Sequence, residues 1–155
     1  MRLSELLTEE VIKVELEAED KEEAFEELVD LLVRSGRISD REAGLRALRL
    51  REKLQSTGIG RGLAIPHGKD PSVKRLSGCL GISREGIDYE SLDGELVRVV
   101  FLLLAEKNNP GPHIEALSQV AKLFMQDGFM ERLLKARNAK EVLTVLAEYE
   151  DREED

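Results

Sequence analysis

The stretch "LVRVVFLLLA", residues 96–105, is almost entirely apolar and shows no alternation between apolar and polar positions. A strand that is buried on both faces of a sheet has such a continuous apolar run. The run is too short to cross a membrane, which takes about 20 apolar residues. It therefore predicts a central strand in a sheet that is covered by helices on both faces.

Further strands and helices are predicted to alternate around this central strand. "VIKVEL" (11–16) alternates apolar and polar residues, and "LSGCLGIS" (76–83) is a second apolar run. Three helix starts carry a polar cap followed three residues later by glutamate: Asp20 with Glu23, Ser39 with Glu42, and Asn138 with Glu141. This alternation indicates an α/β fold, a single domain with a mixed, mostly parallel β-sheet flanked by helices on both faces.

The spacing of the apolar residues sets the expected boundaries of the helices. The second helix is expected to carry Leu45, Leu48 and Leu54 and to end before Gly58. The segment "NNPGP" (108–112) is expected to be a loop, because it combines two prolines with a glycine.

The last third of the chain is predicted to be helical. A helix from His113 should turn Ile114 toward the core, together with apolar residues at helical spacing. The last helix should end near Tyr149, and the acidic residues after it should be frayed. We therefore expect a domain over residues 1–150 and an acidic C-terminal tail over residues 151–155.

Composition favours a globular protein of the cytoplasm. The chain has 155 residues, of which 41% are hydrophobic and 35% charged, a balance that suits one folded domain. Its single cysteine, Cys79, cannot form an intrachain disulfide, and it lies in an apolar run where a buried, inert thiol is expected. The N-terminus lacks the apolar core of a signal peptide, and no direct membrane insertion is expected.

Charge is distributed unevenly along the chain. The net charge is −9, which argues against nucleic acid as the main partner. Residues 34–75 nevertheless hold eleven Arg or Lys and four Asp or Glu, a local net charge of +7. This basic block is either a set of solvated helix faces or a positive field for an anionic group.

The basic block contains "STGIGRGLAIPHGK" (56–69), a glycine-rich motif that matches neither common nucleotide signature. A dinucleotide fingerprint that starts at Gly58 would need its third glycine at position 63, which is Leu. A P-loop would need one residue fewer between Gly62 and Lys69, and a Ser or Thr where Asp70 stands. No nucleotide cofactor is therefore predicted.

The motif ends on one of only two histidines in the chain, His67. Pro66 fixes its own backbone and favours an extended Ile65, which stiffens the peptide that presents His67. Gly68 leaves room around the imidazole. A neutral imidazole nitrogen is a good nucleophile at neutral pH, so His67 is a candidate catalytic nucleophile. The alternative interpretation is that His67 is a capping or loop residue without a catalytic role.

Other residues could hold an anion beside His67. His113 follows a Pro-Gly-Pro segment at a helix start, and Arg51 could reach the glycine loop from the helix before it. The loop itself offers backbone N–H groups, and its candidate phosphate-binding residues are Thr57, Gly58, Gly60, Gly62 and Gly68. Together these groups would suit a phosphoryl group in transfer.

The segment "REKLQSTGIGRGLAIPHGK" (51–69) resembles the active-site signature of the fructose/mannitol-type IIA domains of the bacterial phosphoenolpyruvate:sugar phosphotransferase system, a family that includes nitrogen-regulatory IIA proteins. The similarity continues through "GIDYESLDGELVRVVFLLLA" (86–105) and "PHIEALSQVAKLF" (112–124). One departure is Arg61, where relatives often have Asn or an acidic residue.

The resemblance implies a reaction and its participants. It implies that His67 is the phosphorylated residue, that His113 helps to hold the phosphoryl group, and that Arg51 is the arginine preceding the motif. It implies a phosphotransferase component that forms a phosphohistidine. The donor would be the small phosphocarrier HPr or its nitrogen-branch counterpart, and the sugar-branch acceptor a IIB domain. No metal or other cofactor would be needed, since the donor already carries a phosphohistidine.

Two alternatives remain at this point. A purely regulatory nitrogen-type protein would use the same His67 chemistry to change its binding to other proteins, without sugar transport. A metal or small-anion binding module that uses both histidines is disfavoured, because no Cys, His, Asp or Glu accompanies them at ligand spacing.

Overall fold

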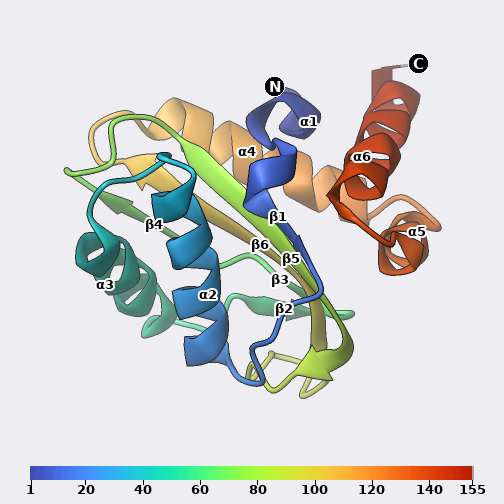
Figure 1. Cartoon of the computed structure of the whole chain (residues 1–155), viewed down its shortest axis with the longest axis horizontal. Coiled ribbons are helices and arrows are strands. Elements are labelled where there is room, and N and C mark those ends of the chain that lie inside the picture. Colours follow the sequence, from blue (N-terminus) through green and yellow to red (C-terminus); the bar gives the residue numbers. More distant parts are fainter. Residues whose placement is uncertain (155) are drawn as a thin grey trace.

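A six-stranded mixed sheet forms the centre of the molecule in the computed structural model, which describes residues 1–154 (Figure 1). The strands run in the order β1-β5-β6-β3-β2, and β4 pairs with β6 beside β3. The bounds of the strands are β1 Ile12–Val14, β2 Gly58–Gly60, β3 Leu63–Ala64, β4 His67–Asp70, β5 Ser77–Ile87 and β6 Val97–Glu106.

Six α-helices and one short 3₁₀ helix, Glu9–Val11, pack around this sheet among the described residues. The bounds of the helices are α1 Leu3–Leu6, α2 Lys21–Arg34, α3 Arg41–Glu52, α4 Pro110–Phe124, α5 Phe129–Lys135 and α6 Ala139–Glu154. α2 and α3 cover one face of the sheet, and α4 lies behind the other face (Figure 1). The predicted α/β fold with helices on both faces is confirmed.

The predicted central strand is β6. Residues 99–105 are all buried, because neighbouring strands flank β6 on both sides and helices cover both of its faces. β5 pairs with it antiparallel, whereas β3 and β4 pair with it parallel along its other edge. Three of the five strand pairings in residues 1–154 are parallel, although the longest ladder, β5 with β6, is antiparallel.

β3 and β4 continue one another along the same edge of β6. Leu63 lies opposite Val99, and His67 lies opposite Leu103. The Leu103 N–H donates to the Pro66 carbonyl at 3.0 Å, so the chain stays attached to β6 between the two strands. His67 therefore opens β4 from a backbone that is held in register.

The helix caps of α2 and α6 agree with the sequence, and that of α3 does not. The Asp20 and Asn138 side chains accept from the N–H groups three residues on, as predicted. In α3 the cap is Asp40, which accepts from the Ala43 N–H at 3.0 Å, and not Ser39. Aspartate is at least as good an N-cap as serine. Because the cap lies one residue later than predicted, its side chain accepts from the N–H of Ala43 and not from that of Glu42. Leu54 lies outside α3 and is 80% exposed.

The boundaries of α4 and α6 differ from the expected ones. α4 begins at Pro110, because prolines in a first helical turn lose no hydrogen bond there. This start leaves Ile114 64% exposed, while Ala116, Val120 and Leu123 face the core. α6 continues through the expected tail to Glu154, and Asp155 lies outside the described residues. No helix in the described chain is long and apolar enough to span a membrane.

Candidate active site

His67 is half-buried, and a backbone carbonyl holds its ring. Its Nδ1 lies 2.7 Å from the carbonyl oxygen of Ile65. A carbonyl can only accept a hydrogen bond, so Nδ1 carries the proton of the neutral ring and Nε2 keeps its lone pair. The turn through Pro66 that stiffens this segment thus also selects the tautomer of His67.

The ring of His113 contacts the ring of His67, and it comes from a helix that covers the sheet. It lies in the first turn of α4, which packs on β6, the strand next to β4. The two ring centroids are 5.4 Å apart, and the ring planes are inclined by 71°. The Nε2 atom of His113 is buried and has no hydrogen-bond partner among the described residues. The pairing of the two histidines that the resemblance implied is therefore present.

Both imidazoles are held in the neutral form. Burial is the main cause of the lowered pKa of His67. The hydrogen bond to the Ile65 carbonyl opposes it, the positive charge of Arg51 adds to it, and Glu52 has a smaller raising effect. Burial also lowers the pKa of His113, with help from His67 and Lys69. A negative group between the rings would reverse these electrostatic penalties, since it favours a protonated imidazole.

Arg51 lies in the last turn of α3. Its Nη1 donates to the carbonyl of Gln55 at 3.0 Å, just beyond the helix end. Its charge contributes to the lowered pKa of His67. Arg51 therefore acts on His67 through its charge, and His113 contacts His67 through its ring.

The glycine segment forms a β-hairpin, β2–β3, in place of the expected open loop. Gly58 pairs with Ala64, and its N–H is donated to the Ser56 hydroxyl. Gly60 and Gly62 have positive φ angles of 106° and 83°, which the hairpin turn requires. Leu63 and His67 lie opposite β6 residues that are four positions apart, about 13 Å along a strand.

The structure therefore does not bring Gly60 and Gly62 to His67. Thr57 is buried as well, and its hydroxyl and N–H both bind the Glu52 carboxylate. Gly68 faces α3, where a Cβ atom would lie 2.8 Å from the Ala47 backbone. Its role is close helix-to-strand packing, and not the freedom around the imidazole that the sequence suggested. The segment is thus a paired hairpin, and phosphate binding by its N–H groups stays a prediction.

Two groups of functional interest were missed. Lys69 stands two residues after His67 in β4, on the same side of the strand, and its charge lowers the pKa of His113. The alternation of a strand could have indicated it. Glu52 follows Arg51 directly, and its bond to Thr57, which in turn bonds to Tyr89, becomes visible only in three dimensions.

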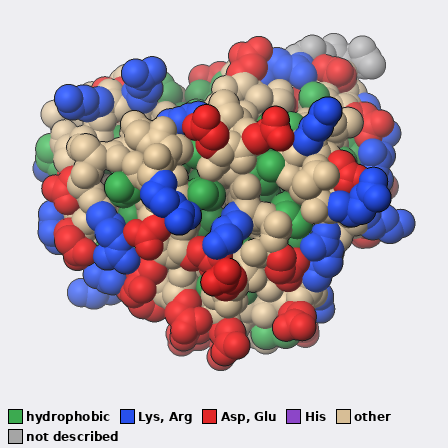
Figure 2. All heavy atoms as spheres, viewed as in Figure 1, with side chains coloured by type: hydrophobic (Ala, Val, Ile, Leu, Met, Phe, Trp, Pro, Cys, Tyr) green, Lys and Arg blue, Asp and Glu red, His purple; other side chains and the backbone are tan. Residues whose placement is uncertain are grey.

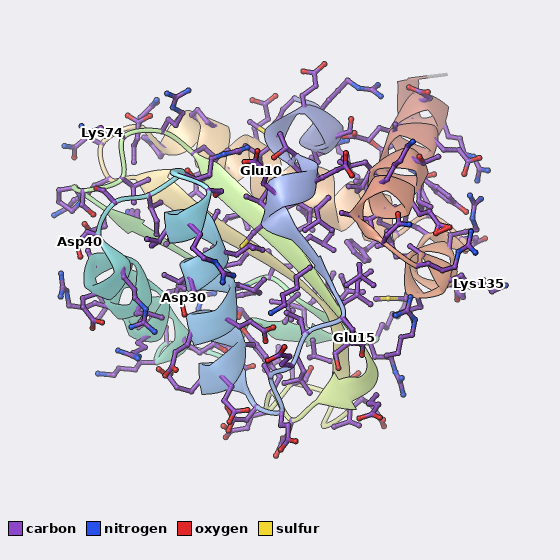
Figure 3. All side chains as sticks on the ribbon, viewed as in Figure 1. Glu10, Glu15, Asp30, Asp40, Lys74 and Lys135 are labelled. Atoms are coloured by element: carbon purple, nitrogen blue, oxygen red, sulfur yellow. The ribbon has the colours of Figure 1, made fainter. Side chains whose placement is uncertain are left out.

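The basic block is partly neutralised by α2. Arg41 pairs with Asp30 of α2 at 2.6 Å, and Arg49 bonds to Glu22 of the same helix. Figure 3 shows Asp30 on α2 next to α3, and Figure 2 shows basic and acidic side chains intermixed on this face. The solvated-face interpretation therefore holds for these arginines. Arg51 and Lys69 remain as the positive charges that act on the two histidines.

The fold and the site together define a class of protein: an α/β domain that presents a neutral, singly protonated histidine beside a second imidazole and an arginine. Among residues 1–154, no group of three or more His, Cys, Asp or Glu could hold a metal ion. This arrangement suits an anionic group that is covalently bound to a histidine nitrogen, or that is transferred to or from it.

The chain belongs to the family described as phosphoenolpyruvate-dependent sugar phosphotransferase system, EIIA 2, whose family model matches residues 5–149. It is thus a IIA phosphocarrier of that system. The resemblance seen in the sequence is confirmed.

Individual relatives come from more than one branch of the family. The chain is 37% identical over 150 residues to the fructose-specific EIIABC component of Bacillus subtilis; this covers 97% of the chain and 24% of that relative. Nitrogen regulatory protein IIA-Ntr from Neisseria meningitidis is 36% identical in structure-based comparison, with a TM-score of 0.85 over 93% of this chain and 98% of that chain.

A third relative was solved together with a partner. It is the complex of enzyme IIAMTL and phosphorylated enzyme IIBMTL from Escherichia coli, with a TM-score of 0.78, 27% identity and coverage of 92% of this chain and 97% of that chain. IIA domains of this family therefore form complexes with IIB proteins.

Proposed function

We propose that Nε2 of His67 accepts a phosphoryl group from a phosphohistidine on an HPr-type carrier and that the chain then passes it to a IIB protein. The observation that carries this proposal is the 2.7 Å hydrogen bond between His67 Nδ1 and the Ile65 carbonyl. It leaves Nε2 unprotonated and gives it the role of nucleophile. The ring of His113, whose centroid lies 5.4 Å from that of His67, supports a role as the second imidazole of the site.

The proposed step needs no cofactor. The Nε2 lone pair of His67 attacks phosphorus, and a new N–P bond forms as the N–P bond of the donor breaks. The donor imidazole leaves with the electron pair of that bond. No proton has to leave Nε2, because the proton of the ring stays on Nδ1 in its bond to Ile65. Transfer to the acceptor is the same displacement at phosphorus, with His67 as the leaving group.

His113 and Arg51 stabilise the charge on the transferring group in this proposal. Phosphoryl transfer spreads negative charge over the equatorial oxygens, so preorganised donors contribute most of the catalysis. The buried Nε2 of His113 has no partner in the part of the chain that the structure describes, and in the proposal it donates to such an oxygen. Arg51 adds a permanent positive charge.

Exposed apolar residues on the segments that carry the site residues support docking of a protein partner. Ile59 is 52% exposed on the hairpin, Leu54 follows Arg51, and Ile114 follows His113. Apolar side chains of this kind are typical of the centre of a protein interface. Leu63 and Ile65, which the sequence also suggested for this rim, are buried and face the core.

A regulatory role remains the second candidate. The matches to a fructose-specific and to a nitrogen regulatory relative have nearly the same identity, 37% and 36%. In the regulatory case the phosphorylated and unphosphorylated forms would bind different target proteins, and the His67 chemistry would be unchanged.

The test is reconstitution from purified proteins. The chain is incubated with phosphoenolpyruvate, enzyme I and HPr, and then with candidate IIB proteins, and acid-labile phosphate on each protein is measured. Wild type should be labelled and should lose its label to a cognate IIB, while His67→Ala should remain unlabelled and folded. Full labelling of His67→Ala would overturn the assignment of the acceptor. Retention of the label against fructose- and mannitol-type IIB proteins would favour the regulatory candidate.

A further inference from the structure

A buried carboxylate, that of Glu52, links the end of α3 to the segment that leads to His67. The Glu52 side chain is 9% exposed. Its Oε1 accepts from the Thr57 N–H at 2.9 Å and lies 3.3 Å from Lys21 Nζ of α2. Its Oε2 accepts from the Thr57 hydroxyl at 2.7 Å. One charged side chain thus satisfies both donors of a single residue.

The network continues into the core through Tyr89. Thr57 Oγ1 is 2.8 Å from the Tyr89 hydroxyl. Because the Thr57 proton is donated to a carboxylate, which can only accept, Tyr89 is the donor of this second bond. Tyr89 is fully buried, and burial raises the pKa of its hydroxyl above the ordinary value, which keeps it a donor. Lys21 Nζ lies 5.2 Å from the centroid of the same ring.

Thr57 is also hydrogen-bonded to the residue that orients His67. The Ile65 N–H donates to the Thr57 carbonyl at 2.9 Å. The Ile65 carbonyl in turn accepts from His67 Nδ1. An unbroken series of hydrogen bonds therefore runs from the Glu52 carboxylate through Thr57 and Ile65 to the imidazole. Glu52 is also the direct neighbour of Arg51 in the chain, at the end of the same helix.

We propose that Glu52 is a positioning residue for phosphoryl transfer, which fixes Arg51 and the His67 ring relative to each other by clamping Thr57. Glu52 does not touch the reacting atoms. This inference rests on the proposed function, which assigns His67 as the acceptor. Misplacing a reacting group by about 1 Å can cost about 100-fold in rate, so a clamp at this point controls the chemical step.

The charge of Glu52 adds a second, measurable effect. The groups that act on His67 are Arg51 and Glu52 from α3, His113 from α4, and the Ile65 carbonyl. Of the charged groups, Arg51 lowers the pKa of His67 and Glu52 raises it. Loss of the Glu52 charge should therefore move the titration of His67 to lower pH, which a role in packing alone would not do.

The test compares variants that keep the shape of the network and change its hydrogen bonds. Thr57→Val removes the hydroxyl at constant size, Thr57→Ser keeps it, and Glu52→Gln removes the charge. Thr144→Val is the matched control, because Thr144 lies exposed on α6. Measurements are the kcat and KM for phosphorylated HPr, thermal unfolding, and NMR titration of the His67 ring.

Thr57→Val and Glu52→Gln should lower kcat by about 10- to 100-fold with little change in KM. Thr57→Ser should restore most of the rate, Thr144→Val should match wild type, and Glu52→Gln should shift the His67 titration to lower pH. Wild-type kcat in folded Thr57→Val or Glu52→Gln would overturn the inference. If Thr57→Val does not fold, Glu52→Gln alone tests the inference. An unchanged His67 titration together with an unchanged kcat in folded Glu52→Gln would then count against the inference.

The two proposals fail in different ways. If His67→Ala is labelled like wild type, the acceptor assignment fails. If His67→Ala is unlabelled while Glu52→Gln and Thr57→Val transfer normally, only the positioning role of Glu52 fails.

Discussion

At the scale of single residues, the site depends on two imidazoles that stay neutral. In the proposed reaction, the Ile65 carbonyl determines which nitrogen of His67 is the nucleophile, and burial favours the neutral ring. The histidines themselves could be predicted, because proline and glycine surround both of them in the sequence. The tautomer could not, since it depends on the direction of the Ile65 carbonyl, and the hydrogen bonds of Ile65 to Thr57 and of Pro66 to Leu103 appear only in the folded chain.

The pH dependence of the reaction follows from the lowered pKa of His67. In the proposed reaction the neutral ring is the nucleophile, so the rate should stay constant as pH falls from 8 and should decline only below the ordinary histidine value of about 6.5. NMR titration of the unphosphorylated protein measures this directly, with His67→Ala identifying the signal. A His67 titration midpoint above 6.5 would contradict the lowered pKa.

Removal of His113 or Arg51 should slow transfer without removing the acceptor. Loss of one stabilising donor in such a site costs about 10²- to 10³-fold in rate. His113→Ala and Arg51→Gln should therefore still be labelled, but slowly, in rapid-quench measurements with phosphorylated HPr. Lys53→Gln, an exposed neighbour of Arg51, provides the control. Wild-type kinetics in both site variants would show that the two residues are bystanders.

At the scale of elements, the contact between α3 and β4 sets the geometry of the site. Gly68 lets α3 approach so closely that a Cβ atom would lie 2.8 Å from the Ala47 carbonyl. The sequence indicated both elements from capping and apolar spacing. The sequence did not indicate the distance between α3 and β4. The small size of Gly68 was therefore interpreted as room for the His67 imidazole, whereas it permits the close approach of α3.

Gly68→Ala should separate α3 from β4. Overpacking of this kind costs about 1–3 kcal/mol of unfolding free energy. Urea unfolding measures the loss, with Gly111→Ala as the matched control, because no atom lies within 4 Å of a Cβ there. We expect the control to be neutral or slightly stabilising, since alanine favours a helix. Equal stability of the two variants would show that the contact is not tight.

The hairpin β2–β3 shows where reasoning from sequence stops at this scale. The sequence predicts that the backbone N–H groups of the glycines in residues 58–62 donate to an anion. Glycine also permits a tight turn, so the same residues fit a hairpin equally well. Only the pairing of Gly58 with Ala64 decides between these uses. The start of α4 is a similar case, since Pro110 and Pro112 fit a first helical turn as well as a loop.

At the scale of the whole molecule, a net charge of −9 surrounds a site on whose histidines the positive charges of Arg51 and Lys69 act, with Glu52 as the opposing negative charge at His67. The basic block of residues 34–75 could be counted from the sequence. Its neutralisation by α2 could not, because the pairs Arg41–Asp30 and Arg49–Glu22 join residues from two helices. What remains at the site is a local field around Arg51 and Lys69.

Raising the salt concentration should slow transfer from phosphorylated HPr. Attraction between the local positive field and the phosphorylated donor is screened beyond about 8 Å at physiological ionic strength. Second-order rates measured at several salt concentrations should fall, and Lys69→Gln should flatten the dependence. Lys74→Gln, on the exposed loop after β4, serves as the control (Figure 3). A rate that does not change with salt would leave docking to shape and apolar contact alone.

The hydrogen bond between His67 and Ile65 also determines how the modified protein could be recognised. Phosphohistidine exists as two isomers, with phosphorus on either the Nε2 (tele) or the Nδ1 (pros) atom. A ring whose Nδ1–H is bound to a backbone carbonyl 2.7 Å away can form only the tele isomer without breaking that bond. Antibodies that discriminate the two isomers would therefore follow the loading of this chain in living cells, and its signal would be confined to the tele reagent.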